Sequence, residues 1–252
     1  MKTIIVGAGK VGTATGNKLN CEVVYHDPFK GLVVPDDQWR EADYVIVCVD
    51  TLQTGYSDHR DLRDALESVV KIGYKGTVAI RSTVHPDFLR WLELQPVKYV
   101  MFPEFMVQRG QESSDDPWTV VVGGVEPLAT DFLAALVDAQ YCTDLNAYRT
   151  MTAVEAIITK LAANAALAAK VITFNAIYGV CEDYGADFEA VRFPIGEDKR
   201  IGHGHTIAPS PDDQLLGFGG HCLPKDIKAL ADVDRTGFFQ TVDLINRGLG
   251  RA

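Results

Sequence analysis

The side chains best suited to covalent chemistry lie near the end of the chain. Cys222 follows the glycine-rich run 217–220, and Lys225 and Asp226 come three and four residues after it. If Pro224 opens a helix, Cys222 sits at its N-terminal edge, where the helix dipole and a nearby cation favour a thiolate. Asp226 would then orient or activate a water molecule. The sequence therefore predicts a nucleophilic cysteine, against the common alternative of a small buried hydrophobe.

A second candidate pair lies in a long helical stretch. Lys160 and Asn164 are four residues apart, so they share one helix face, among alanine, leucine and isoleucine neighbours. A buried lysine needs a partner or a function, and this pair would stabilise an oxyanion through a charge and an amide N–H. The alternative, equally open from the sequence, is that Lys160 extends to the surface and Asn164 caps a local turn.

A glycine loop near the N-terminus predicts a dinucleotide site. An apolar strand is followed by Gly7-Ala8-Gly9-Lys10-Val11-Gly12, and Asp27 ends the next strand. The glycines allow a tight turn, close approach of a pyrophosphate and close helix–strand packing, while the acid would hold a ribose hydroxyl. An acid at this point favours NAD over NADP, and the short interval to Asp27 implies a shortened first helix. The alternative is an ordinary tight turn with a surface aspartate.

Alternating strands and helices must position these candidate site residues. Over about the first 140 residues, β-branched runs alternate with helical patterns, which is typical of βαβ units and a mostly parallel sheet. Strands are predicted at 3–6, 22–25, 44–49, 77–81, 98–102 and 119–122, with helices at 62–71 and 127–139 among others. Thr152 and Glu155 are spaced as a capping box, and a long apolar helix follows to about Tyr184. A loop over 193–220 and two short helices complete the chain.

The expected fold is α/β. A Rossmann-like, doubly wound sheet at residues 1–146 would bind NAD, and a long central helix with a small all-helical domain would occupy residues 147–252. Apolar residues cover most of the circumference of the central helix, so we expect it to be buried between layers or in a subunit interface.

Composition excludes several classes of protein. The 252 residues carry a net charge of −10, which argues against a general nucleic-acid binder. No uninterrupted apolar run is longer than the one at 44–49, which is too short to span a membrane, and the N-terminus lacks the features of a signal peptide. Five cysteines without a CxxC pair indicate thiols in a reducing, cytoplasmic compartment. No metal site is expected, because no cluster of cysteine and histidine has the required spacing.

Taken together, these pieces resemble the UDP-glucose/GDP-mannose dehydrogenase family, in family order over almost the whole chain. The glycine run that ends in a Cys-Leu-Pro-Lys-Asp sequence is the most specific of them. The matching segments are Gly7–Gly12, Ser82-Thr83-Val84, Pro103-Glu104-Phe105, Lys160-Leu-Ala-Ala-Asn164, Gly185-Ala186-Asp187, Arg200-Ile201-Gly202 and Gly217-Phe218-Gly219-Gly220-His221-Cys222-Leu223-Pro224-Lys225-Asp226.

The resemblance implies a two-step oxidation of a nucleotide-sugar primary alcohol to a carboxylate, with two NAD and one water. Cys222 would add to the intermediate aldehyde and later carry a thioester. Lys160 and Asn164 would steady the oxyanion, Asp226 and Thr83 would hold the water, and Glu104 would assist acid–base steps.

The resemblance also implies cofactor and substrate contacts beyond these residues. Thr51, Ser82 and Thr83 would join the glycine loop and Asp27 in holding NAD. Arg200 would contact the sugar phosphate, in a neighbouring subunit, because the family forms dimers through the long central helix. The full set of expected substrate contacts is Glu104, Lys160, Asn164, Arg200, Phe218, Gly219 and Cys222.

Several positions depart from the family pattern. Gln108 replaces a second glutamate, Phe102 replaces an asparagine, and Asp50-Thr51-Leu52 replaces a Thr-Pro turn. The family usually continues into a C-terminal domain that grips the nucleotide, so we expect a truncated form here. The loop between Arg200 and Cys222 is longer than usual and could partly replace that domain.

Two other functions stay open from the sequence. The β-hydroxyacid dehydrogenases also combine a dinucleotide domain with a helix lysine and asparagine four apart, but their two-electron chemistry needs no cysteine nucleophile. A non-catalytic NAD-binding module, descended from such an enzyme, is the other alternative. Counting the NADH formed per substrate separates the first two, and a tight NAD complex without turnover would identify the third.

Overall fold

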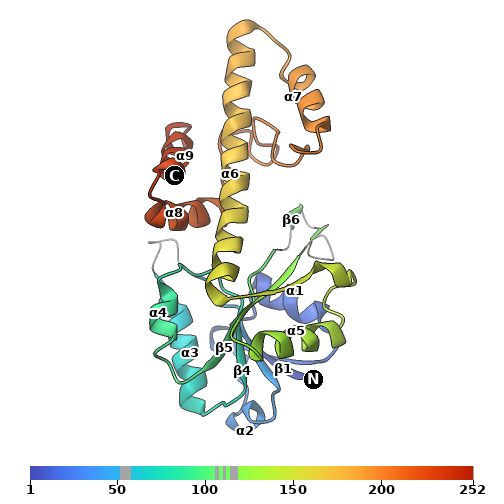
Figure 1. The fold of residues 1–252 in the computed structure, drawn as a ribbon, viewed down its shortest axis with the longest axis vertical. Helices are drawn as coiled ribbons and strands as arrows, with labels where there is room; N and C mark the ends of the chain where they lie inside the picture. Colours follow the sequence, from blue (N-terminus) through green and yellow to red (C-terminus); the bar gives the residue numbers. More distant parts are fainter. Residues whose placement is uncertain (52–57, 106–107, 110–111, 114–118, 252) are drawn as a thin grey trace. The chain divides into compact units, whose positions relative to one another are not determined.

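A computed structural model describes residues 1–51, 58–105, 108–109, 112–113 and 119–251. The chain divides into two compact units, Met1–Lys160 and Leu161–Ala252, and the division falls inside one long helix. The first unit is built on a seven-stranded sheet with the order β2-β1-β3-β4-β5-β8-β9 (Figure 1). Its strands are β1 (Lys2–Val6), β2 (Glu22–His26), β3 (Tyr44–Val47), β4 (Thr77–Ile80), β5 (Lys98–Met101), β8 (Val120–Gly124) and β9 (Tyr148–Met151).

The sheet is parallel except where β8 runs antiparallel to β5. Helices α1 (Lys10–Lys18) and α5 (Leu128–Asp138) cover one face, and α3 (Arg60–Ile72) and α4 (Phe88–Leu92) cover the other (Figure 1). The predicted doubly wound α/β fold is therefore confirmed. The remaining short elements of this unit are η1 (Pro28–Lys30), α2 (Asp36–Trp39), η2 (Leu145–Ala147) and a two-stranded ribbon of β6 (Gln108–Arg109) and β7 (Glu112–Ser113).

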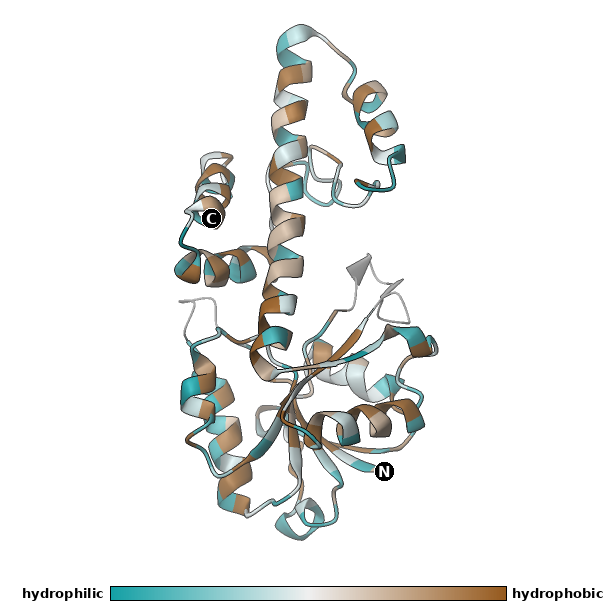
Figure 2. Cartoon of the chain, in the orientation of Figure 1, coloured by the Kyte–Doolittle hydropathy of each residue, from teal (hydrophilic) through white to brown (hydrophobic). Residues whose placement is uncertain are grey.

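The central strands form because they are short β-branched runs that can be buried on both faces. Residues Val45–Val47 of β3 and Val78–Ile80 of β4 are at most 1% exposed. On the helix side, Phe132 of α5 packs edge-on against Phe102 and Tyr44. Figure 2 shows that apolar residues are concentrated on the strands and on the helix faces turned toward them.

The glycine loop is shaped by steric necessity at two positions. Gly7 has φ +93°, a left-handed conformation that side chains disfavour, and it directly follows β1. A Cβ on Gly12 would lie 1.9 Å from the backbone oxygen of Gly7, so only glycine lets α1 start this close to the strand. Helix α1 has nine residues, which confirms the shortened first helix.

The structure differs from the expected elements at two places. Strand β9 was not predicted, because a four-residue edge strand with Arg149 and Thr150 exposed has little hydrophobic signature. The predicted loop at 193–220 begins too early, since α7 (Phe188–Glu197) continues past Pro194. Asp187 caps α7 by accepting from the Glu189 N–H at 2.9 Å, and Phe188 packs against Tyr178, so capping and packing outweigh the hydrogen bond that proline removes.

The second unit is helical. Helix α6 (Ala153–Tyr184) starts in the first unit and continues into this one, followed by α7, α8 (Leu223–Val233) and α9 (Phe238–Gly248). A small core between α6 and α7 contains Phe174, Cys181, Phe188 and Ala208. The two short closing helices that the sequence predicts correspond to α8 and α9, which pack against each other.

Helix α6 is buried on only one side. Its buried residues, which include Ile157, Leu161, Ala165 and Ile172, repeat at the helical period. Its length and mean hydropathy would also suit a membrane span, a property that core helices share. The capping box is as predicted: the Glu155 carboxylate accepts from the Thr152 hydroxyl and from the Thr152 N–H, each at 2.7 Å, and these two bonds lower the pKa of Glu155.

The contact between Gly12 and Gly7 provides a test of this fold. Gly12→Ala should lower the free energy of unfolding by about 2–3 kcal/mol, because its methyl group meets backbone that cannot move aside. Gly9→Ala is the matched control: its Cβ meets nothing within 4 Å, so we expect a change below about 1 kcal/mol. Urea unfolding of both apo variants measures the difference, and equal stabilities would contradict the packing described here.

Candidate active site

The carboxyl ends of three neighbouring parallel strands assemble the candidate cofactor site. The glycine loop follows β1, Thr51 lies shortly after β3, and Ser82 lies shortly after β4. Both Thr51 and Ser82 are buried, and the Ser82 hydroxyl donates to the Val49 carbonyl at 2.6 Å. These strands meet at one edge of the sheet, which is where doubly wound folds bind their ligands.

Asp27 is tied directly to the glycine loop. Its carboxylate accepts from the Ala8 N–H at 3.0 Å, and the Lys30 ammonium donates to the Ala8 carbonyl at 2.5 Å. Lys10 and Val11 begin α1, whose first N–H groups have no acceptor within the helix. With open space at Gly9 and an acid at the end of β2, these residues fit a dinucleotide: its pyrophosphate at the helix start and its ribose at Asp27.

Lys160 is buried and has an acidic partner in the first unit. Its ammonium lies 3.9 Å from the Glu104 carboxylate, and the two side chains are 7% and 16% exposed. The Phe105 ring lies 5.5 Å from the same ammonium. The alternative left open by the sequence, that Lys160 extends to the surface, is therefore wrong. Thr83 is half-buried and follows Ser82 directly.

Asn164 joins α6 to α8 within the second unit. Its amide donates to the Asp226 carboxylate at 2.6 Å, so the alternative of a local turn cap is wrong. Asp226 is only 1% exposed, and the Lys225 ammonium lies 3.9 Å from its other oxygen. A charge buried to this degree requires partners of this kind.

Cys222 stands at the start of α8, as the sequence predicts. It is the N-cap residue, Pro224 occupies one of the first two helical positions, and the Cys222 carbonyl accepts from the Asp226 N–H at 3.0 Å. Cys222 is exposed, which removes the alternative of a buried hydrophobe. A thiol at a helix N-terminus gains from the dipole when it ionises.

The other four cysteines lie in different surroundings. Cys48, Cys142 and Cys181 are buried, and Cys21 is partly buried. Burial raises the pKa of Cys48 to about 12 and also raises the pKa of Cys21. Both thiols stay protonated at neutral pH. All five cysteines lie in the described part of the chain, and Cys222 is the exposed one among them.

The loop before Cys222 is held by residues that the sequence analysis missed. Asn175 of α6 and Asn246 of α9 bind the backbone of Gly217 and Phe218, and Arg251 donates to the Leu216 carbonyl at 2.8 Å. Arg251 also pairs with Asp213 at 2.5 Å, which lowers the pKa of Asp213 to about 2 and keeps it ionised at neutral pH. Asparagines on the apolar faces of helices were the signal that could have revealed this arrangement.

Two of the expected substrate contacts already have protein partners in the structure. Phe218 is 2% exposed and both its backbone polar groups bind Asn246, which is a structural role. Arg200 is 89% exposed, and its guanidinium pairs with Asp198 at 2.5 Å. Gly219 lies between Phe218 and Gly220, where a Cβ would come within 2.9 Å of the Arg251 guanidinium.

Comparisons with known proteins agree with this geometry. The family model for the central domain of the UDP-glucose/GDP-mannose dehydrogenase family matches residues 154–247, which contain Lys160, Asn164, Cys222 and Asp226. UDP-glucose 6-dehydrogenase YwqF of Bacillus subtilis is 30% identical over 239 residues, covering 88% of this chain. The chain belongs to the UDP-glucose/GDP-mannose dehydrogenase family.

Solved structures share the fold of this family member. A UDP-glucose dehydrogenase of Pyrobaculum islandicum matches with a TM-score of 0.76 and 24% identity, over 97% of this chain and 67% of that one. A 3-hydroxyisobutyrate dehydrogenase of Mycobacterium tuberculosis matches with a TM-score of 0.73 and 16% identity, over 98% and 93%. The chain spans about half the length of the curated relatives it matches, 48% of the Bacillus enzyme.

The hydrogen bond between Asn164 and Asp226 can be tested by replacing the amide with a carboxylate. Asn164→Asp would place a second carboxylate about where the amide now lies, 2.6 Å from Asp226. We expect a loss of about 2–3 kcal/mol in the free energy of unfolding at pH 8, because a second carboxylate would repel the buried carboxylate of Asp226. The loss should be smaller at pH 5.5, where the carboxylates can share a proton. Urea titrations at both pH values measure it, and equal losses would contradict the pairing.

Proposed function

We propose that the protein is an NAD-dependent nucleotide-sugar 6-dehydrogenase that oxidises a primary alcohol, as in UDP-glucose, to the carboxylate. The observation that carries this proposal is Cys222, an exposed thiol at the N-terminus of α8, one helical turn from the buried Asp226. A two-electron oxidation of an alcohol needs no such nucleophile, whereas a four-electron oxidation uses it to hold the aldehyde.

In this proposal residues 1–146 form the NAD-binding domain and residues 147–252 the helical catalytic and dimerisation domain. Gly7, Gly9, Lys10, Val11 and Gly12 would receive the pyrophosphate and Asp27 the ribose, with Thr51, Ser82 and Thr83 along the same sheet edge. NAD, when bound, supplies the acceptor for a hydride, and two equivalents are needed for four electrons. A cytoplasmic location fits the five cysteine thiols.

The chain's own residues would bind the aldehyde covalently, stabilise the oxyanion and activate the water. After the alcohol carbon has lost one hydride and its hydroxyl proton, the Cys222 thiolate adds to the aldehyde carbon, and Lys160 and Asn164 steady the resulting oxyanion. Loss of the second hydride leaves a thioester. Water held by Asp226 and Thr83 then attacks it, which releases the carboxylate and restores the thiol.

The remaining site residues would bind or assist. Glu104, which already pairs with Lys160, would take and return protons during the two oxidations. The exposed Arg200 would exchange its partner Asp198 for a sugar phosphate in a neighbouring subunit, because arginine binds phosphate as readily as carboxylate. Gly219 and the backbone near Phe218 would line the sugar.

The stoichiometry of the reaction tests the proposal. With NAD and UDP-glucose or a related nucleotide sugar, two NADH should form per acid, followed by absorbance at the nicotinamide band. Cys222→Ser should lower acid formation by about three orders of magnitude or more with normal thermal unfolding, because serine is a poor nucleophile without a base. Cys21→Ser, at a partly buried sulfur, is the matched control.

The alternatives give different readings in the same assay. One NADH per substrate would indicate the two-electron dehydrogenase, and tight NAD binding without turnover on UDP-, GDP- or dTDP-sugars would indicate a non-catalytic module. Normal acid production by Cys222→Ser would remove the cysteine from the mechanism. The first two results would overturn the proposed function, and the third would overturn its mechanism.

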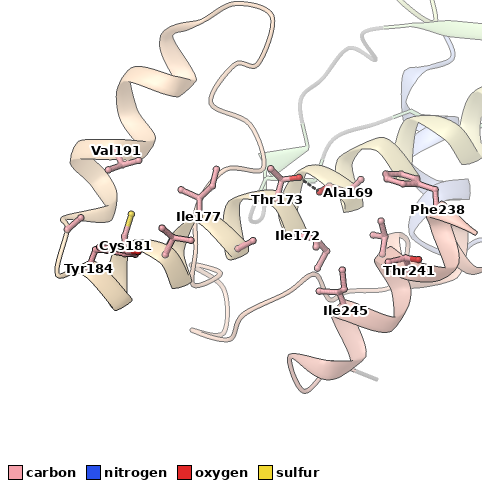
Figure 3. A pocket seen from close by; sticks show the side chains of 14 residues that line it. Ala169, Ile172, Thr173, Ile177, Cys181, Tyr184, Val191, Phe238, Thr241 and Ile245 are labelled. Atoms are coloured by element: carbon pink, nitrogen blue, oxygen red, sulfur yellow. Dashed lines mark hydrogen bonds between the residues drawn. The ribbon is translucent and has the colours of Figure 1, made fainter.

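We also propose that a second copy of the chain covers an apolar groove on the helical unit. The groove has a volume of about 690 Å³, and Figure 3 shows its wall, formed by α6, α7 and α9. The hydroxyls of Thr173 and Thr241 are satisfied by carbonyls of their own helices, so the wall is apolar in character. Its members include Ile172, Ile177, Val180, Tyr184, Val191, Phe238 and Ile245.

Exposed apolar side chains on this wall favour a symmetric protein partner. Val180 is 57% exposed, Phe238 53% and Ile245 46%, which is costly to leave in water. Val180→Asp should convert a dimer to a monomer in size-exclusion chromatography with light scattering. Val154→Asp, 41% exposed on the same helix but outside the groove, should leave the dimer intact. A monomeric wild-type protein, or a dimer insensitive to Val180→Asp, would contradict this interface.

A further inference from the structure

Asn246 is a buried asparagine on α9 that binds a single residue of the loop before Cys222. It is 2% exposed. Its side-chain oxygen accepts from the Phe218 N–H at 2.7 Å, and its side-chain nitrogen donates to the Phe218 carbonyl at 3.0 Å. One amide thus satisfies both polar groups of one backbone residue, whereas a carboxylate could accept from the N–H but could not donate to the carbonyl.

We infer that Asn246 is a positioning residue for Cys222. The inference rests on the proposed function, in which the cysteine is the nucleophile. We define the cysteine loop as residues 216–222. Asn246 fixes this loop at Phe218, four residues before the thiol, and α8 fixes it at the other end, where Cys222 is the N-cap residue.

A second asparagine supports the same attachment. Asn175 accepts from the Gly217 N–H at 2.8 Å and donates to the Val171 carbonyl of its own helix at 2.8 Å. Gly217 has φ +79°, and a Cβ there would lie 2.4 Å from the Asn246 oxygen. Glycine at 217 is therefore required for the loop to approach the amide, and α6 and α9 hold adjacent residues of it.

The stretch between the two fixed ends needs this restraint. Gly219 and Gly220 have no side chains to pack, and Gly220 adopts φ +79°. Without an anchor at Phe218 such a stretch has many backbone conformations available. Because α9 also packs against α8, one pair of helices carries both the anchor and the thiol. Small displacements of a reacting group cost large factors in rate.

Asn246→Asp tests the inference with little change in volume. A carboxylate still accepts from the Phe218 N–H but opposes the Phe218 carbonyl, so the anchor opens. We expect kcat to fall about tenfold or more, with KM for NAD changed by less than about twofold. The pH profile of Cys222 alkylation by iodoacetamide should move to higher pH, because a loop released at Phe218 lets the Cys222 side chain turn away from the first N–H groups of α8.

A control variant and a replacement variant accompany Asn246→Asp. Asn20→Asp, at an exposed amide that donates to Gln140, should change neither kcat nor the alkylation profile. If Asn246→Asp does not unfold cooperatively, Asn246→Ser, which is smaller and cannot reach both groups, takes its place with the same expected shifts. A folded variant with the wild-type kcat and alkylation profile would overturn the inference. The alkylation arm needs no turnover, so it decides the role of Asn246 even if wild type oxidises no nucleotide sugar.

Discussion

The hydrogen bond between the Asn164 amide and the Asp226 carboxylate is the constraint on which the candidate site depends. Asp226 lies in the first turn of α8, and its burial is compensated by a donor from α6 and by the charge of Lys225. The same turn begins at Cys222. Fixing Asp226 against α6 therefore also fixes the helix start that presents the thiol. The acid that would hold the water and the cysteine that would act as nucleophile thus lie in the same helical turn.

Much of this arrangement could be predicted from the sequence because it is local. Gly7–Gly12 and Asp27 flank two short apolar strands, and their roles in a tight turn and at a strand end follow from neighbours a few residues away. Pro224 near the start of α8 placed Cys222 at the N-cap for the same reason. The long apolar run likewise predicted α6 to within a few residues, with its capping box at Thr152 and Glu155.

What the sequence could not decide depended on partners far along the chain. The burial of Lys160 is compensated by Glu104, 56 residues earlier, and the amide of Asn164 binds Asp226, 62 residues later. Asn246 reaches Phe218 across 28 residues; its place on an apolar helix face indicates that it needs a partner, but not which residue provides it. Edge strand β9 and the part of α7 beyond Pro194 form through pairing and packing that outweigh weak local preference.

The most direct test of the central claim is to trap the covalent intermediate. Asp226→Asn should slow hydrolysis more than oxidation, because an amide cannot activate the water. After mixing with NAD and UDP-glucose, intact-protein mass spectrometry with peptide mapping should find a uronyl thioester on the peptide that contains Cys222. Acid formation by this variant at a normal rate, with no adduct on Cys222 at any quench time, would contradict the account.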